Sequence, residues 1–415
     1  MMKRLTKGIL VIMCLALLSV PAAAFDMGDH VYQAPNGIGD VLIYPVYFAD
    51  QGVETKFGVI NTSSEVCVVA KVIVRSYRYS QELLDFLIYL SPNDEFVCTL
   101  KYDGGKYVME TSDDSLCDIT GEVPTVYELT PPDCEDDSVA EGYIEVIEAW
   151  STVNAEILCP DSATDPGTVD KSWIFDTYAG IGSVSRFDTA DVLSGFAELT
   201  FAGFDYLVYQ PTVLAEYDNL EKMAIFGLET RLGTNARNNL CEVEAALSKN
   251  NLVIPYYDSA AGATFPIITF PTKLSNCDGV SDSPYFDPDD PTYVMHKYDL
   301  EEHEKTSHCT HSPCDVTTYT LPYEVNLLLV DSYYEEGWGR LTFNKTGNTS
   351  CRTEGDSYLC YTGAPAIGLI AEFTAEGLAL LPPAYDFGTV AVNDATECNI
   401  VNDEVPCYQL GGTVN

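Results

Sequence analysis

Residues 301–314, EEHEKTSHCTHSPC, concentrate side chains that could bind a metal ion. They hold three of the five histidines of the chain and two of its 14 cysteines. Zinc takes three or four nitrogen, sulfur or oxygen ligands, usually from close pairs spaced as C-x2-4-C or H-x3-5-H. His303, His308 and His311 supply enough ligands for a transition-metal site, although no second ligand pair follows at the usual distance.

The two cysteines of this stretch have a second interpretation. In an oxidising compartment, cysteines form disulfides more readily than they remain thiolate ligands. We therefore favour a disulfide between Cys309 and Cys314, or bonds from these residues to other cysteines, over a metal site. The C-x-x-C-H pattern of haem attachment does not occur in the sequence.

Acidic turns form a second group of candidate ligands. Calcium takes six to eight oxygen ligands, which clustered carboxylates on turns can supply. The strongest candidates are Asp287, Asp289 and Asp290 in DSPYFDPDDP, residues 282–291. No stretch has the EF-hand spacing, so solvated turns are the alternative, and calcium is the one cofactor that these carboxylates suggest.

The sequence contains no convincing catalytic pattern. The G-x-S-x-G motif of hydrolases does not occur. The 63 acidic residues guarantee many accidental carboxylate pairs, so pairs alone do not indicate glycoside cleavage. We predict that the protein is not an enzyme.

The N-terminus has the three parts of a secretory signal. Lys3, Arg4 and Lys7 precede an apolar run over residues 8–20, and an A-x-A site over 22–24 predicts cleavage before Phe25. The run is shorter than the ~20 residues that span a bilayer. We expect export to the periplasm, the outer surface or the medium, with no integral membrane segment after cleavage.

Thirteen cysteines remain after the predicted cleavage, which indicates disulfides in an exported chain. Because the number is odd, one thiol is free or bonds a second chain. Close spacing predicts four local pairs: Cys117 with Cys134, Cys309 with Cys314, Cys351 with Cys360, and Cys398 with Cys407.

The charge balance limits the choice of partner. The chain has 21 basic and 63 acidic residues, a formal net charge of −42. Such a surface repels nucleic-acid phosphates and anionic membranes. A protein or surface partner remains, and the sequence does not identify it.

Strand patterns dominate the rest of the chain. Residues 67–79 alternate apolar and basic positions with the period of a half-buried strand, and Asp103-Gly104-Gly105 predicts a hairpin turn. We predict a mostly β fold with two antiparallel, immunoglobulin-like β-sandwich lobes and one or two short helices. The expected parts are a signal peptide (1–24), a β-sandwich domain (25–112), an acidic Cys/Pro-rich connector (113–138), and a second β-rich lobe (139–415) with a helix near 236–250.

Several phrases also occur in an order that resembles a family of uncharacterised secreted β-rich proteins of Gram-negative bacteria. They include LDFLIYLSPND near residue 90, FPIITFPTK over 265–273 and EVNLLLVD over 324–331. The resemblance implies export and a β-rich fold, and it implies no activity and no site residue.

Export, disulfides and a β architecture without a catalytic pattern together favour a non-catalytic secreted or cell-surface protein. We expect an adhesion, scaffold or assembly module. The alternative is an exported metal- or ligand-binding protein, and the third possibility is an extracellular hydrolase.

Overall fold

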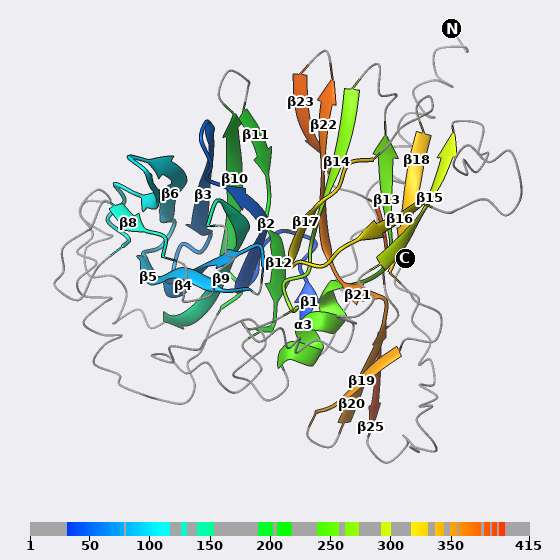
Figure 1. Ribbon diagram of the computed structural model, residues 1–415. Helices are drawn as coiled ribbons and strands as arrows, with labels where there is room; N and C mark the ends of the chain where they lie inside the picture. Colours follow the sequence, from blue (N-terminus) through cyan, green and yellow to red (C-terminus); the bar gives the residue numbers. More distant parts are fainter. Residues whose placement is uncertain are drawn as a thin grey trace, which may run out of the picture.

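A computed structural model shows that the chain is mostly β, as predicted (Figure 1). The described residues are 31–78, 80–116, 126–130, 139–152, 190–201, 206–217, 239–256, 262–273, 292–299, 317–330, 337–343, 349–354, 357–374, 377–381, 384–387 and 390–394. Within these ranges there is one helix, and it is neither long nor apolar enough to cross a membrane. All the strand pairs described are antiparallel.

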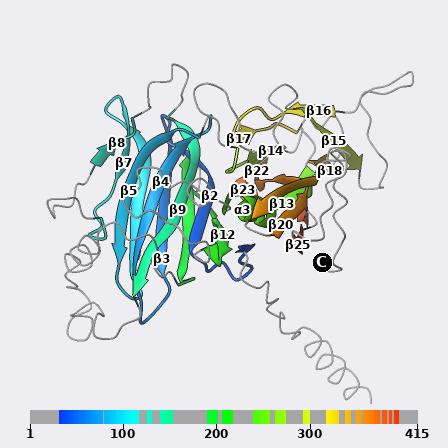
Figure 2. The same cartoon turned by 90° about the horizontal axis from the view of Figure 1, so that it is seen from below.

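The first lobe is a sandwich of two six-stranded sheets (Figure 2). Sheet A has the order β1-β12-β2-β9-β4-β5, and sheet B has the order β11-β10-β3-β6-β7-β8. Their strands are β1 (Tyr32–Gln33), β2 (Val41–Phe48), β3 (Val53–Asn61), β4 (Cys67–Ser76), β5 (Glu82–Leu90), β6 (Glu95–Asp103), β7 (Lys106–Glu110), β8 (Val126–Glu128), β9 (Glu141–Thr152), β10 (Leu193–Phe201), β11 (Tyr206–Tyr209) and β12 (Thr212–Ala215).

This sandwich extends well beyond the boundary predicted near residue 112. Strand β9 lies between β2 and β4, and β10 and β12 pair with β3 and β2. Part of the predicted connector is also in the sandwich, because β8 pairs with β7. The proposed division at 112 and 138 therefore cuts through one lobe, since sequence periodicity shows strands but not their distant partners.

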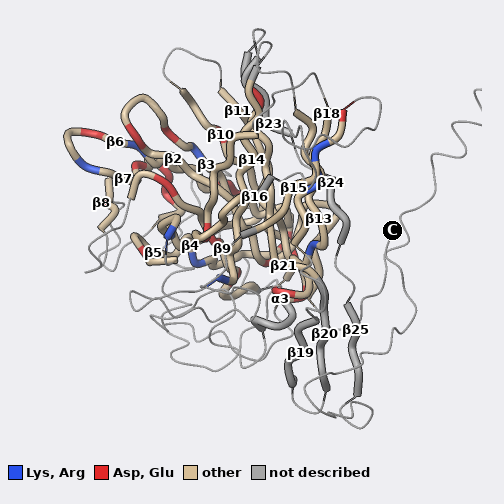
Figure 3. Tube along the Cα trace, turned by 45° about the vertical axis from the view of Figure 1, so that its right-hand side comes forward, with Lys and Arg blue, Asp and Glu red and all other residues tan. Residues whose placement is uncertain are grey.

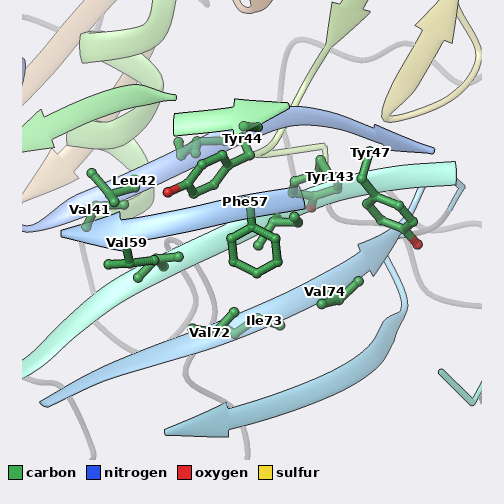
Figure 4. Close-up of a cluster of buried hydrophobic side chains, with 14 of the residues drawn as sticks. Val41, Leu42, Tyr44, Tyr47, Phe57, Val59, Val72, Ile73, Val74 and Tyr143 are labelled. Carbon is green, nitrogen blue, oxygen red and sulfur yellow. The ribbon is translucent and has the colours of Figure 1, made fainter. Parts of the chain in front are cut away.

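The core of the first lobe fills the space between its two sheets. Tyr44 and Phe57 come from different sheets, and their ring centroids lie 5.4 Å apart (Figure 4). The Phe57 ring also meets Phe96 edge-on at 6.3 Å. The Tyr44 hydroxyl donates to the Gly58 carbonyl at 2.6 Å, so its polar end is satisfied inside the core.

The alternating pattern of residues 67–79 is only partly explained by a half-buried strand. All ten residues of β4 are buried, including its two basic side chains, Lys71 and Arg75. Lys71 pairs with Asp85 of β5 at 2.7 Å. The basic positions are therefore buried charges with acidic partners, and the prediction that they face water was wrong.

The predicted hairpin turn is present between β6 and β7. Asp103 pairs with Lys106, which leaves Gly104 and Gly105 as a two-residue loop. Both glycines have positive φ, 57° and 92°. A turn of this kind requires positive φ at both central positions, which explains why glycine occupies them.

The second lobe contains sheets C and D and a small three-stranded sheet. Sheet C has the order β16-β15-β18-β13-β21 with β24 also on β13, sheet D has the order β17-β14-β22-β23, and the small sheet has the order β19-β20-β25. Their strands are β13 (Ser248–Tyr256), β14 (Gly262–Thr269), β15 (Thr292–Asp299), β16 (Thr317–Thr320), β17 (Val325–Leu327), β18 (Gly337–Thr342), β19 (Thr349–Glu354), β20 (Ser357–Thr362), β21 (Ala364–Pro365), β22 (Ile367–Thr374), β23 (Gly377–Leu381), β24 (Ala384–Phe387) and β25 (Val390–Asp394).

Sheets C and D enclose a second apolar core. Ile268 and Phe270 from the β14 segment pack with Leu252, Ile254 and Leu341 of sheet C. The helix α3 (Asn239–Leu247) lies next to β1, β20 and β21, and it ends three residues before its predicted limit, because β13 begins at Ser248.

The two lobes are joined by apolar packing as well as by the chain. Ile267, Val325, Ile367 and Leu369 of sheet D belong to the same buried cluster as the core of the first lobe. The Thr269 hydroxyl donates to the Pro45 carbonyl of β2 at 2.5 Å. Sheet D thus packs against sheet C and against the first lobe.

Candidate functional site

The candidate metal ligands lie outside the described residues. This is the case for His303, His308 and His311, and also for Asp287, Asp289 and Asp290. In the ranges that the structure describes, no group of three or more histidine, cysteine, aspartate or glutamate residues is arranged to hold a metal ion. Both metal sites therefore stay predictions.

The structure bears on one of the four predicted disulfide pairs. Cys351 and Cys360 are directly opposite each other in the β19–β20 ladder. Opposite residues of an antiparallel pair have Cα atoms about 4.5–5.5 Å apart, within the range that a disulfide bridges. The backbone thus permits this bond. The other candidates, Cys117, Cys134, Cys309, Cys314, Cys398 and Cys407, lie outside the described residues.

Cys98 of β6 has a free thiol, and it is buried in the core of the first lobe. Its exposed fraction is 2%. Burial, and to a lesser extent the nearby Asp113, raises the pKa of the thiol well above its ordinary value. A neutral, enclosed thiol is a poor nucleophile and cannot reach a second chain.

We expect Cys98 to be the odd cysteine, unreactive in the folded protein. A thiol reagent should modify no cysteine under native conditions and one per chain after unfolding without reductant. The protein should run as a monomer in non-reducing electrophoresis, and Cys98→Ser should abolish the labelling after unfolding. A disulfide-linked dimer that survives Cys98→Ser would show that another cysteine is unpaired.

A polar network occupies the place where the two lobes meet, and we call it the seam. It comprises Arg75, Tyr77, Ser80, Tyr143 and Glu145 of the first lobe and Pro271, Lys273, Tyr323, Glu324 and Val325 of the second.

The centre of the seam is a buried ion pair. The Arg75 guanidinium donates through Nε to Glu145 Oε2 at 2.9 Å, and both side chains are fully buried. Arg75 Nη1 also donates to the Ser80 carbonyl at 3.1 Å. Burial lowers the pKa of Arg75, but Glu145, Tyr143 and Glu82 together raise it by more, so the guanidinium stays charged.

Tyr143 connects this ion pair to the second lobe. Its hydroxyl lies 2.8 Å from Ser80 Oγ and 3.4 Å from the Pro271 carbonyl. Burial and the negative charge of Glu145 raise the pKa of the phenol well above its ordinary value. Tyr143 therefore acts here as a neutral hydrogen-bonding group and not as a base.

Backbone and ring contacts extend the seam to the start of β17. The Val325 amide donates to the Tyr77 carbonyl at 3.1 Å. The rings of Tyr77 and Tyr323 meet edge-on with centroids 5.1 Å apart, and Arg78 lies over the Tyr323 ring. The Lys273 ammonium donates to the Pro322 carbonyl, and burial lowers the pKa of Lys273 while Glu324 opposes that shift.

Sequence reasoning did not find the seam. Arg75 and Glu145 are 70 positions apart, and no local pattern relates them. One signal was present, because the phrase FPIITFPTK over 265–273 contains Thr269, Pro271 and Lys273. In the sequence the phrase indicates only a family resemblance, and nothing in it predicts a contact between the lobes.

A second buried amine, Lys249 of β13, has unusual electrostatics. Its ammonium lies 3.0 Å from the Leu247 carbonyl and 3.3 Å from Gln33 Oε1 of β1. Burial lowers its pKa to about 7. Such an amine is partly neutral and nucleophilic near pH 7, but the residue is only 1% exposed. A substrate cannot reach it in this conformation.

The exposed apolar side chains are a different kind of feature. Among the described residues the large ones are Val126, Tyr206, Val208, Leu327 and Leu329, each more than half exposed. Leu327 and Leu329 are two positions apart in the β17 segment, which lies at the margin of sheet D. The other such pair in the described part of the chain, Tyr206 and Val208, lies on β11 at the margin of sheet B, next to β23.

Comparison of the chain with protein-family models, with curated proteins and with solved structures found no match.

Proposed function

We propose that this is a non-catalytic exported protein that acts at a cell surface or in the periplasm as a rigid scaffold, adhesion or assembly module. The observation that carries the proposal is the seam between the two lobes. Backbone and ring contacts across the seam and a shared apolar core fix one lobe on the other, so the molecule presents its outer strands in a set arrangement.

The seam argues against a catalytic cleft at this boundary. Enzymes that close domains around a substrate use hinges, and their facing surfaces separate to admit it. Here the facing surfaces are in contact: Tyr143 reaches Pro271, and Thr269 reaches Pro45. The charged side chains of the seam are themselves buried.

Export and disulfides complete the proposal. The N-terminal pattern of residues 1–24 supports export, and the high cysteine content supports an oxidising destination. The opposed backbones of Cys351 and Cys360 support a local disulfide in the β19–β20 hairpin.

We expect the purified mature protein to bind without turnover. It should release no product from polysaccharide, peptide or ester substrates. Hydrolysis that persists through purification and disappears when a single carboxylate is replaced would overturn the proposal. Elemental analysis of protein purified without chelator tests the metal-binding alternative, which stoichiometric bound metal would favour.

A further inference from the structure

Strand β17 forms an edge of sheet D that no described strand covers (Figure 1). Its inner side is paired with β14: Leu328 and Val330 donate to the carbonyls of Pro266 and Thr264 at 2.9 and 3.0 Å. In an antiparallel ladder, alternate residues direct their amide and carbonyl groups to opposite sides. The backbone groups of Leu327 and Leu329 therefore point away from β14, toward the open side.

The side chains at these two positions are apolar and exposed. Leu327 is 54% exposed and Leu329 is 55% exposed. Leu327 lies opposite Ile267 in the β14–β17 ladder, so both side chains are on the same face of sheet D. Ile267 is buried in the cluster that includes the core of the first lobe. The Val325 amide is already bonded to Tyr77, and among the described residues no strand pairs with the edge beyond that contact.

This edge lacks the features by which proteins usually prevent strand pairing. Natural edge strands carry charged residues, proline or a bulge. Residues 325–330 read VNLLLV, with no charge and no proline. An edge with open backbone groups and alternate apolar side chains is the surface that strand addition uses, in which an extended peptide becomes the next strand.

Charge determines which peptide fits. The chain carries a net charge of −42, and the sequence directly after this segment continues with Asp331, Glu335 and Glu336. Strands β17, β14 and β23 of sheet D contain no charged residue, and β22 contains one, Glu372; Figure 3 shows the uncharged trace of β14. The basic side chains nearest the start of β17 already have partners. Arg78 lies over the Tyr323 ring, and the Lys273 ammonium donates a hydrogen bond to the Pro322 carbonyl. A second copy of this chain would bring like charge, whereas a cationic segment is attracted.

We propose that the β17 edge accepts, by strand addition, an extended peptide segment with apolar side chains at alternate positions and lysine or arginine between them. The amides and carbonyls of Leu327 and Leu329 would pair with the backbone of the segment, and its apolar side chains would cover both leucines. The inference rests on the proposed function, since it names the partner class of the same assembly module.

Peptide binding to the full mature protein tests this inference. The probe is a fluorescent peptide of about nine residues that alternates lysine and valine, a common strand length. Two control peptides carry the same charge: one groups the lysines and valines into blocks, and one is N-methylated at alternate residues. We expect the alternating peptide to bind at about 0.15 M salt, where long-range attraction is screened, and both controls to bind about tenfold more weakly or less.

Variants locate the binding. Leu327→Lys and Leu329→Lys should each weaken binding about tenfold or more, because each adds a cation and removes an apolar contact. Val126→Lys is the matched control, since Val126 is 51% exposed on β8, the margin of sheet B. It should bind like the wild type. Thermal unfolding should be nearly the same for all three variants, because the residues are exposed.

Four outcomes would overturn the inference. They are no binding of the alternating peptide, equal binding of the N-methylated peptide, equal binding by Leu327→Lys, or a wild-type dimer that Leu327→Lys dissociates in sedimentation. The last would identify a second copy as the occupant. Each leaves the non-catalytic proposal intact, whereas substrate turnover with unchanged peptide binding would refute that proposal alone.

Discussion

Replacing Arg75 with alanine should lower the free energy of unfolding by about 3–5 kcal/mol, the cost of leaving a buried charge without its partner. Glu145 is fully buried and receives the Nε–H of Arg75 at 2.9 Å, so the variant leaves a carboxylate inside the seam. Glu145→Ala should also be strongly destabilising, because it leaves the buried guanidinium with only the partly exposed Glu82, 3.9 Å away, as an acidic partner. Urea unfolding with a far-ultraviolet signal measures both.

Two controls separate loss of the ion pair from general damage. The double variant Arg75→Met/Glu145→Leu removes both charges and should recover much of the loss, because replacing a buried pair with apolar groups is often nearly neutral. Lys106→Ala removes one partner of the exposed Lys106–Glu128 pair and should cost less than about 1 kcal/mol. If Arg75→Ala were as mild as Lys106→Ala, the buried ion pair would not contribute to stability.

Lys249→Met should stabilise the protein at neutral pH and change how its stability depends on pH. In the folded protein burial lowers the pKa of Lys249 from 10.5 to about 7. Between these two values the unfolded chain binds more protons, so the wild-type stability contributed by this group rises as pH rises from about 7 to about 10.5. Below about pH 7 the Lys249 ammonium is charged in the folded protein, and its destabilising effect is fully present. The pKa shift limits this effect to at most about 5 kcal/mol.

The measurement is the difference in unfolding free energy between the wild type and Lys249→Met from pH 6 to pH 10. The difference should be largest near pH 6 to 7 and shrink toward pH 10. Taking this difference removes the pH dependence that both proteins share because of their acidic surface. Lys56→Met, at an exposed position of β3, should show little change in this difference across the range. A constant difference for Lys249→Met would mean that its ammonium is charged in the folded protein throughout.

Local patterns were enough to predict the β character and many strands. The strand pattern over 67–79 became β4, and the glycines at 104 and 105 marked a real turn. The helix predicted near 236–250 contains α3. These features depend on residues close in sequence, which is the information that periodicity contains.

Features that depend on distant contacts were not predictable in the same way. Arg75 looked like a solvent-facing residue because an alternating strand usually exposes its charged positions, and only the fold brings Glu145 to it. The boundary near residue 112 was misplaced for the same reason, because β9 was assigned to the other lobe. The open edge at Leu327 was likewise hidden, since an apolar strand segment reads as buried until its neighbours are known.

The pairing of β2 has a consequence for how the chain folds. The neighbours of β2 in sheet A are β9 and β12. Neither edge of β2 can therefore be paired until residues 141–215 are present. Contacts between such distant segments close late and slowly. Sheet A of the first lobe can therefore be completed only after the segments that form β9 and β12 have been synthesised.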